Sequence, residues 1–275
     1  MSRLEKVSVG SVEVFALRDG ELNLPKEVFI NLDDKTSQNL SKDENSNLSL
    51  SNINAYLIKQ GNRNLLVDAG CRELFGPNCG FIKEALLEAG TKPSDITDIF
   101  FTHMHPDHVA GSIDVEGNAI FSNAIVKVLD AEHNFWNADH FDNIDVNGND
   151  WANLAKSVFG AYEDRIEILS SASEIIPGVN IINLPGHTPA HSGFRVDDGN
   201  KSFIHMGDVL HVPNLQLSDP NIALVFDVDP EAAMKSRKMI FDMVSNDKTL
   251  CSSGHMLTPK FGYLEKSGAG YEFFV

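Results

Sequence analysis

The chain has 275 residues, a formal net charge of −17 and a sequence pI near 4.9. Its 22 Lys and Arg residues are scattered along the chain, so we expect no basic surface for nucleic acid or for an anionic membrane. Hydrophobic residues make up 42%, enough for a large core that needs no disulfide or structural metal to fold. The three cysteines are too few for a disulfide framework and are typical of a reducing compartment. Because no apolar run is long enough for a signal peptide or a membrane span, we predict a cytoplasmic protein.

The first predicted elements are strands. Alternating apolar and polar residues over 6–20 predict a hairpin or strand pair that closes at Gly20. Residues 31–52 are rich in Asn, Ser and Asp, lack aromatic residues and predict a long loop, either a surface excursion or a lid or subunit contact. Two strands around a Gly-Asn turn are predicted over 54–70.

Helices and strands then follow one another to the end of the chain. The apolar spacing predicts helices at 80–90, near 131–136, at 151–164 and at 229–244. It predicts strands at 97–103, 124–130, 165–169, 179–185, 191–208 (a hairpin) and 249–256. This mixture, without a repeat or a linker, predicts an α/β (α+β) fold in a single domain over residues 1–275.

Three histidines and an aspartate crowd into residues 103–108, directly after a predicted buried strand. His103 and His105 are two residues apart, so an extended backbone directs both to the same side. Pro106 favours an extended His105 and prevents the strand from continuing. Asp107 and His108 then follow a bend and can face a second point. This segment is either a polar loop that happens to be rich in histidine or a source of ligands for two neighbouring metal centres.

Three further predicted strands end in a metal-binding type of side chain. His187, Asp208 and His255 each follow a strand and a glycine, which permits a tight turn. One such histidine alone is more often a core or surface residue than a ligand, but the recurrence at four strand ends favours a shared site. Imidazole and carboxylate ligands without thiols suit Zn, Mn, Co or ferrous iron, and such sites commonly leave room for water, as catalytic metals do.

The motif HxHxDH at residues 103–108 resembles the signature of the metallo-β-lactamase superfamily, and the similarity runs from about residue 54 to residue 255. The resemblance implies an αβ/βα sandwich of two mixed β-sheets flanked by helices. It also implies that the first ion is held by His103, His105 and His187, the second by Asp107, His108 and His255, and that Asp208 bridges both.

Differences between branches of the superfamily narrow the choice. Asp208 occupies a position where true β-lactamases generally lack an aspartate, and His105 one where flavodiiron proteins carry a glutamate. RNA-processing members need basic regions that this chain lacks. Glyoxalase-II-like thioesterases share the ligands but bind glutathione through a basic C-terminal region, where this chain has only Lys260 and Lys266 after His255. A thioesterase therefore stays an alternative.

The segments 66–80, 102–112, 184–196 and 207–220 are similar to the branch that contains methyl parathion hydrolase and quorum-quenching lactonases. His211 occupies the position at which the best-known acyl-homoserine lactonases carry a tyrosine. At this position the parathion-hydrolase group is similar to this chain. The resemblance therefore implies a hydrolase with two divalent ions, zinc first among the candidates. A metal-bridging hydroxide would cleave a small hydrophobic phosphotriester, lactone or carboxyl ester. It also implies a homodimer.

Catalytic and substrate-binding roles follow from the same resemblance. Asp107 and Asp208 are predicted to be catalytic, Asp107 by orienting the nucleophile. Phe75, Trp136 and His211 are predicted to bind substrate, although Phe75 and Trp136 suit ordinary core packing equally well. Two other functions stay open: a mononuclear iron enzyme that oxidises thiols or persulfides, and a non-enzymatic protein whose metals only hold the loops together.

The remaining polar residues near the motifs are predicted to be structural. We expect Asp68 to anchor the metal-binding loops through backbone hydrogen bonds and His191 to hold the loop of His187. His205, on an apolar strand, is predicted to lie in the core. His133 and His140 flank a predicted helix and are expected to be solvated.

Overall fold

The computed structural model describes residues 2–42, 47–138, 148–258 and 260–275. The strands are β1 Leu4–Val9, β2 Val12–Asn23, β3 Phe29–Ile30, β4 Leu50–Gln60, β5 Arg63–Val67, β6 Asp98–Phe100, β7 Ile125–Leu129, β8 Ile166–Leu169, β9 Glu174–Ile176, β10 Val179–Asn183, β11 Ser192–Asp198, β12 Lys201–His205, β13 Ala223–Leu224, β14 Leu250–Ser252, β15 Tyr263–Ser267 and β16 Gly270–Phe274. The α-helices are α1 Asp34–Lys42, α2 Ile82–Glu88, α3 Pro106–Val109, α4 Asp130–Asn137, α5 Gly148–Ala161, α6 Pro213–Gln216 and α7 Pro230–Asn246.

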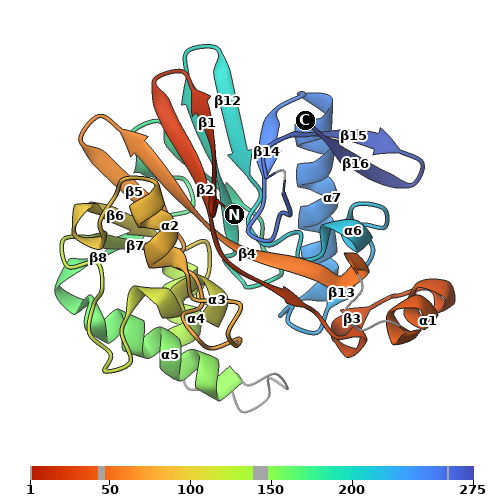
Figure 1. The fold of residues 1–275 in the computed structure, drawn as a ribbon, viewed down its shortest axis with the longest axis horizontal. Coiled ribbons are helices and arrows are strands. Elements are labelled where there is room, and N and C mark those ends of the chain that lie inside the picture. Colours follow the sequence, from red (N-terminus) through yellow and green to blue (C-terminus); the bar gives the residue numbers. More distant parts are fainter. Residues whose placement is uncertain (1, 43–46, 139–147, 259) are drawn as a thin grey trace.

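Two mixed sheets form the centre of the molecule (Figure 1). The larger sheet has the strand order β1-β2-β4-β5-β6-β7-β8, and the smaller has the order β14-β12-β11-β10-β9. Strands β5 to β8 are parallel to one another, and β12 is parallel to β14. Neighbouring residues of one strand bury opposite faces, as Tyr56 and Leu57 of β4 do in two different hydrophobic clusters. Both faces of the larger sheet are therefore covered.

The layers are ordered helix, sheet, sheet, helix. Tyr56 and Phe100 of the larger sheet pack with Phe194 and Phe203 of the smaller one, so a core lies between the sheets. On the outer face of the larger sheet, α2 and α5 pack over residues such as Leu57. On the outer face of the smaller sheet lies α7, on the opposite side of the molecule (Figure 1). This arrangement confirms the predicted αβ/βα sandwich.

The first hairpin turns earlier than the sequence predicted. Strands β1 and β2 meet at Val9 and Val12, whereas Gly20 lies inside β2, next to a register shift against β4. A side chain at Gly20 would collide with the backbone of Cys79. The glycine therefore marks a close approach of two backbones inside a strand, not the end of a hairpin.

The prediction of a long loop over 31–52 is wrong over part of its length. Helix α1 occupies Asp34–Lys42, and β4 already begins at Leu50; residues 43–46 lie outside the described part. The carboxylate of Asp33 accepts a hydrogen bond from the Thr36 N–H at 3.0 Å and caps the helix. Leu40 is the single buried residue of α1, so the segment lacks the apolar stripe by which a helix is found in a sequence.

The long helix α7 begins as the sequence indicated. Pro230 occupies its first turn, and the Asp229 carboxylate accepts a hydrogen bond from the Ala232 N–H at 3.0 Å.

Among the described residues, no helix combines the length and the apolar character that crossing a membrane requires.

Candidate metal centre

Four strand ends converge on one region. The segments after β10, β12 and β14 carry His187, Asp208 and His255. Because β11 runs antiparallel to both β10 and β12, and β14 runs parallel to β12, these three strands end at the same edge of the smaller sheet. The segment after β6 of the larger sheet brings residues 103–108 to the same place.

The local backbone of the 103–108 segment agrees with the sequence argument. His105 is extended, with φ −68° and ψ 153°, and Pro106 begins the short helix α3. The rings of His103 and His105 lie on the same side, with centroids 4.6 Å apart. Asp107 and His108 lie in the first turn of α3, beyond the bend, and face a different group of side chains.

One group of potential ligands consists of His103, His105 and His187. One ring nitrogen from each lies within 4.8 Å of the others, and all three residues are buried. The Nδ1 atom of His105 is 2.9 Å from Nε2 of His187. Three imidazoles from two sheets thus surround a single point.

The second group contains Asp107, His108, Asp208 and His255. The Oδ2 atom of Asp208 lies 2.9 Å from Nε2 of His108 and 2.8 Å from Nε2 of His255. Asp107 Oδ2 is 3.4 Å from Nε2 of His108 and 3.6 Å from Nε2 of His255. Asp208 therefore lies between the two groups, since its Oδ2 is also 3.8 Å from Nε2 of His187.

Two glycines shape the segments that carry these ligands. Gly186 has φ +130°, and a side chain there would collide with the backbone at Ala233 of α7. Gly207 has φ +55°, and a side chain there would collide with the ring of His191. Only glycine fits both conditions, which is why each strand can release its ligand directly into the site.

In three of the rings, the nitrogen that points away from the ligand position is held by a second residue. His108 Nδ1 is 2.8 Å from Asp68 Oδ2, His187 Nδ1 is 2.8 Å from Asp227 Oδ1, and His255 Nδ1 is 2.6 Å from the Asn52 carbonyl oxygen. Such bonds fix the orientation of an imidazole and turn its other nitrogen toward the ligand position. The orientation of these three rings is thus fixed by the protein itself.

Electrostatics divide the histidines into two kinds. Burial lowers the pKa of His103 and His105 well below the usual value, so both rings are neutral and have a free lone pair. Burial acts in the same direction on His108, but Asp208, Asp107 and Asp68 together raise its pKa well above the usual value. This part of the site therefore holds an excess of negative charge that a cation would neutralise.

The residues present fit divalent metal ions. Within the described part of the chain, His103 Nε2 and Asp208 Oδ1 are buried without a hydrogen-bond partner. A buried polar atom left unpaired costs about 1–3 kcal/mol, and a metal ion at this point would offset that cost. Imidazole nitrogens and carboxylate oxygens, with no thiolate among them, are the donor set expected for zinc or a similar ion in a catalytic site.

A cavity of about 410 Å³ opens directly onto these residues. His105, Asp107, His187, Asp208 and His255 form its polar floor. Its remaining wall is mostly apolar and comprises Leu22, Leu24, Pro25, Val28, Phe75, Trp151 and Phe226, with Asn23, Ser51 and His211. Such a cavity suits a small substrate with an apolar body and one polar group.

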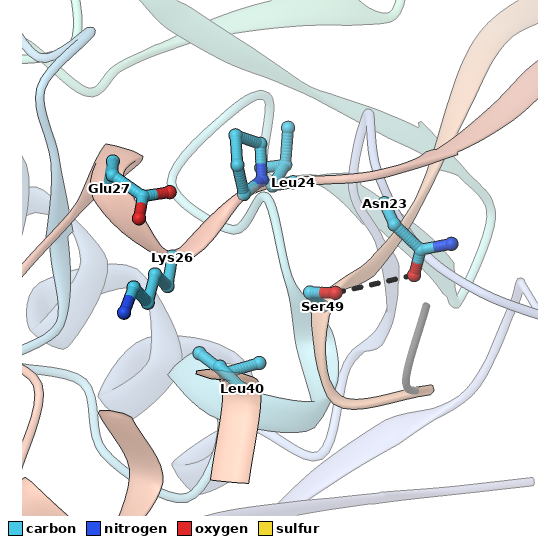
Figure 2. Close-up of a pocket in the computed structure, with 7 residues that line it drawn as sticks. Asn23, Leu24, Lys26, Glu27, Leu40 and Ser49 are labelled. Atoms are coloured by element: carbon cyan, nitrogen blue, oxygen red, sulfur yellow. Dashed lines mark hydrogen bonds between the residues drawn. The ribbon is translucent and has the colours of Figure 1, made fainter. Parts of the chain in front are cut away.

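A smaller cavity of about 220 Å³ adjoins the same 23–25 segment (Figure 2). Asn23, Leu24 and Pro25 line both cavities, so this segment belongs to the wall of each. The rest of its lining consists of Lys26, Glu27, Leu40 of α1 and Ser49. The Ser49 hydroxyl donates to Asn23 Oδ1 at 3.3 Å. The segment predicted as a lid or surface loop thus borders the wall of the main cavity.

The family model of the metallo-beta-lactamase superfamily matches residues 48–255, the span that contains every potential ligand named above. The chain belongs to the metallo-beta-lactamase superfamily. It is a metal-dependent hydrolase, and its relatives below are hydrolases and lactonases. Which ligand holds which ion stays a prediction.

Similar proteins are found by sequence and by structure. An N-acyl homoserine lactonase from a Bacillus species is 24% identical over 229 residues, which cover 75% of this chain and 82% of the relative. AidC, a dizinc quorum-quenching lactonase solved in complex with a product, has a TM-score of 0.89 at 25% identity, covering 99% of this chain and 97% of AidC. The hydrolase AbOPH of the beta-lactamase superfamily has the same scores and coverage.

Two of the three residues predicted to bind substrate, Phe75 and His211, line the cavity. The side chain of Phe75 is 44% exposed. The expectation for Trp136 is wrong: it is 2% exposed and lies among the core residues packed against α5, where its Nε1 donates to Glu132 at 2.6 Å. Trp151 of α5 contributes the indole of the cavity wall instead, with its ring 4.9 Å from that of His105.

The structural residues mostly lie where they were expected. Asp68 accepts a hydrogen bond from the Thr102 N–H at 2.9 Å, and its other oxygen meets His108. His191 accepts from the Asp208 N–H at 2.7 Å and lies 2.7 Å from the Leu184 carbonyl oxygen, so it joins two ligand segments. His205 is buried against Tyr56 and Phe194, as predicted for a core residue.

The expectation of a solvated His133 needs correction. His133 is half-buried, and its ring packs against Phe159 at 4.7 Å, because α4 lies against α5. His140 lies outside the described residues. Two buried carboxylates that contact the ligand segments, Asp227 and Glu132, were not predicted from the sequence. Neither lies in a motif, and the signal that distinguishes them is their burial, which a single sequence does not reveal.

Proposed function

We propose that this protein opens the ester ring of small lactones that carry an apolar acyl chain, and that it does so with two zinc ions. The observation that carries the proposal is the cavity itself, in which an apolar wall faces two adjoining groups of metal-binding side chains. A lactone carbonyl at the floor leaves the acyl chain against Leu24, Trp151 and Phe226. The similarity to AidC over nearly the whole chain supports the same substrate class.

The assignment of ligands rests on the two groups. His103, His105 and His187 would hold one ion and Asp107, His108 and His255 the other, with Asp208 shared between them. When bound, such ions lower the pKa of a water molecule toward neutrality and polarise the substrate oxygen.

The two carboxylates at the floor have different tasks. The Asp107 side chain is 21% exposed and lines the cavity, whereas that of Asp208 is 1% exposed. Asp107 can therefore accept a hydrogen bond from the attacking water and orient it toward the carbonyl carbon. Asp208, fixed by His108 and His255, holds the two halves of the site at a constant separation. His211 borders the same space and contacts the substrate near the ring.

A second candidate is the hydrolysis of aryl esters or aryl phosphotriesters at the same site. The specific observation in its favour is the group of aromatic side chains in the wall, where the rings of Trp151 and Phe226 lie 6.1 Å apart. A glutathione thioester is disfavoured, because the cavity has no Lys or Arg among its described lining residues to pair with the carboxylates of that substrate. Seven donors in two adjoining groups favour two ions over a mononuclear iron centre, and His187 and Asp208 also form a third, overlapping group with His211.

A substrate panel tests the proposal. Zinc-reconstituted protein is assayed with N-hexanoyl-homoserine lactone, an aryl acetate, an aryl phosphotriester and S-lactoylglutathione. We expect kcat/KM for the lactone to exceed the others by about tenfold or more, because differential binding in the transition state decides specificity. The reverse order would favour the aryl substrates, and turnover confined to the thioester would contradict both candidates.

Metal analysis tests the ions independently of any substrate. Protein purified without chelators is expected to hold two equivalents of a transition metal per chain, with zinc the main one. Fully active protein without metal would contradict the scheme.

We further propose a homodimer in the cytoplasm, and sedimentation of the purified protein at several concentrations tests the dimer.

A further inference from the structure

Glu132 of α4 is a buried carboxylate outside both ligand groups. It is 1% exposed, and both of its oxygens accept hydrogen bonds. Oε1 accepts from the Met104 N–H at 3.1 Å and from Trp136 Nε1 at 2.6 Å, and Oε2 accepts from the Thr188 hydroxyl at 2.7 Å. Burial of a carboxylate is costly unless its oxygens are bonded, and here each oxygen is.

The partners of Glu132 belong to two ligand segments that come from different sheets. Met104 stands between His103 and His105 on the segment after β6, and Thr188 follows His187 on the segment after β10. One carboxylate thus connects the two segments that carry all three histidines of one group. The backbone links the two segments at a further point, where the Ser192 N–H donates to the Thr102 carbonyl oxygen at 3.1 Å.

The other ligand group is held by different residues. His108 is oriented by Asp68, His255 by the Asn52 carbonyl group, and the Asp208 N–H by His191. None of these residues is among the hydrogen-bond partners found for Glu132 in the described part of the chain. Asp68 and His191 also reach the first group, Asp68 through the Thr102 hydroxyl, which lies 3.0 Å from His103 Nδ1, and His191 through the Leu184 carbonyl group. Glu132, in contrast, bonds directly to segments that carry histidines of the first group.

We propose that Glu132 is a positioning residue for one of the two ions only, the ion held by His103, His105 and His187. The inference rests on the proposed two-ion site, and it assigns Glu132 a role in affinity at a single half of that site. Removing a group that orients metal ligands typically weakens binding by about 10- to 100-fold. The loss is expected at this ion and not at its neighbour.

The variants separate positioning from general damage. Glu132→Ala removes every bond, whereas Glu132→Gln keeps an oxygen for Met104 and Trp136 and an amide that donates to the Thr188 hydroxyl. Trp136→Phe is the matched control, because it removes the one bond of the carboxylate that stays within α4 and keeps an aromatic ring beside His105. Circular dichroism and urea unfolding of the metal-free proteins identify any variant that has lost its fold.

Cobalt(II) is the probe, because its visible absorption reports the coordination of each bound ion without an assay of activity. Glu132→Ala is introduced into two backgrounds, His255→Ala, which damages the second group, and His187→Ala, which damages the first. We expect Glu132→Ala to weaken cobalt binding about 10- to 100-fold with His255→Ala and less than about threefold with His187→Ala. Glu132→Gln should restore most of the affinity, and Trp136→Phe should change neither.

The outcomes distinguish the two proposals. Equal losses in both backgrounds, or no loss in either, would overturn the role of Glu132. Binding of a single cobalt ion by the unmodified protein would contradict the two-ion site, whichever way the Glu132 variants behave.

Discussion

The Oδ2 atom of Asp208 lies 2.8 Å from Nε2 of His255, across the ends of the parallel strands β12 and β14. The same oxygen lies 3.8 Å from Nε2 of His103, which comes from the other sheet. One carboxylate therefore reaches histidines of both groups. Its position follows from the turn at Gly207, which places Asp208 directly after β12.

Replacing this carboxylate should affect both ions at once. We expect Asp208→Ala to lower turnover by about 100-fold or more, because several kcal/mol of charge stabilisation in the transition state are lost. Bound metal, measured by plasma emission spectrometry, should fall together with kcat. Asp247→Ala, at an exposed position after α7, is the control and should change neither. A variant at Asp208 that kept its metal and its turnover would show that another residue joins the two groups.

Asp227 should control the ion beside His187. Its Oδ1 lies 2.8 Å from His187 Nδ1, and its Oδ2 accepts from the Leu224 N–H at 3.0 Å, so the carboxylate is itself fixed. We expect Asp227→Asn to weaken zinc affinity by about 10- to 100-fold in competition with a chelator. Asp229→Asn nearby should leave the affinity unchanged, because asparagine caps α7 as well as aspartate does. Equal affinities for the two variants would remove Asp227 from the support of the site.

The two aromatic residues singled out from the sequence should now behave differently. Phe75→Ala is expected to raise KM for long-chain or aryl substrates several-fold, with the free energy of unfolding changed by less than about 0.5 kcal/mol, because the side chain is exposed at the cavity. Trp136→Ala is expected to lower the free energy of unfolding by about 3–5 kcal/mol, because it empties a buried site. Urea unfolding and steady-state kinetics on both variants check this. Similar losses of stability would mean that Phe75 also belongs to the core.

The helices α2, α4, α5 and α7, the strands from β4 to β8 and the meeting of the potential ligands followed from the sequence, because they rest on local patterns. Helix α1 and the β15–β16 hairpin did not. Extended residues two apart share a side, and the proline after His105 fixes its conformation, so the directions of His103 and Asp107 could be worked out. A metal-binding type of side chain follows four predicted strands, and these side chains can meet only if the strands end at a common edge. That edge exists because β10, β12 and β14 point the same way.

Residues whose role depends on the assembled fold could not be predicted in this way. Trp136 and Trp151 are both aromatic residues near helices, and only the packing of α4 against α5 decides which one faces the cavity. Helix α1 lacks an apolar stripe because Leu40 is the only one of its residues that is buried against the rest of the molecule. Gly20 and Gly10 are equally suitable for a turn, and the contact with Cys79 that places Gly20 inside a strand is distant in sequence.

His205 should make the stability of the metal-free protein depend on pH. Burial lowers its pKa to about 3, an effect that Asp208 opposes and that His108 and His191 reinforce. The unfolded chain, with a histidine pKa near 6.5, therefore binds more protons than the folded chain at pH values between about 6.5 and 3. The stabilisation that a neutral His205 contributes is complete above about pH 6.5 and is lost as the pH falls toward 3.

The variant His205→Gln isolates this contribution. In the original protein, His205 Nδ1 accepts a hydrogen bond from the Gly207 N–H at 3.2 Å. The variant removes the titrating ring, and its amide oxygen can accept the same hydrogen bond. We expect the difference in the free energy of unfolding between the original protein and the variant to shrink by up to ~1.4 kcal/mol per pH unit below about pH 6.5. Urea unfolding at several pH values from about 7.5 to about 4.5 measures it. Parallel pH profiles for the two proteins would mean that His205 takes up its proton in the folded state as readily as in the unfolded chain.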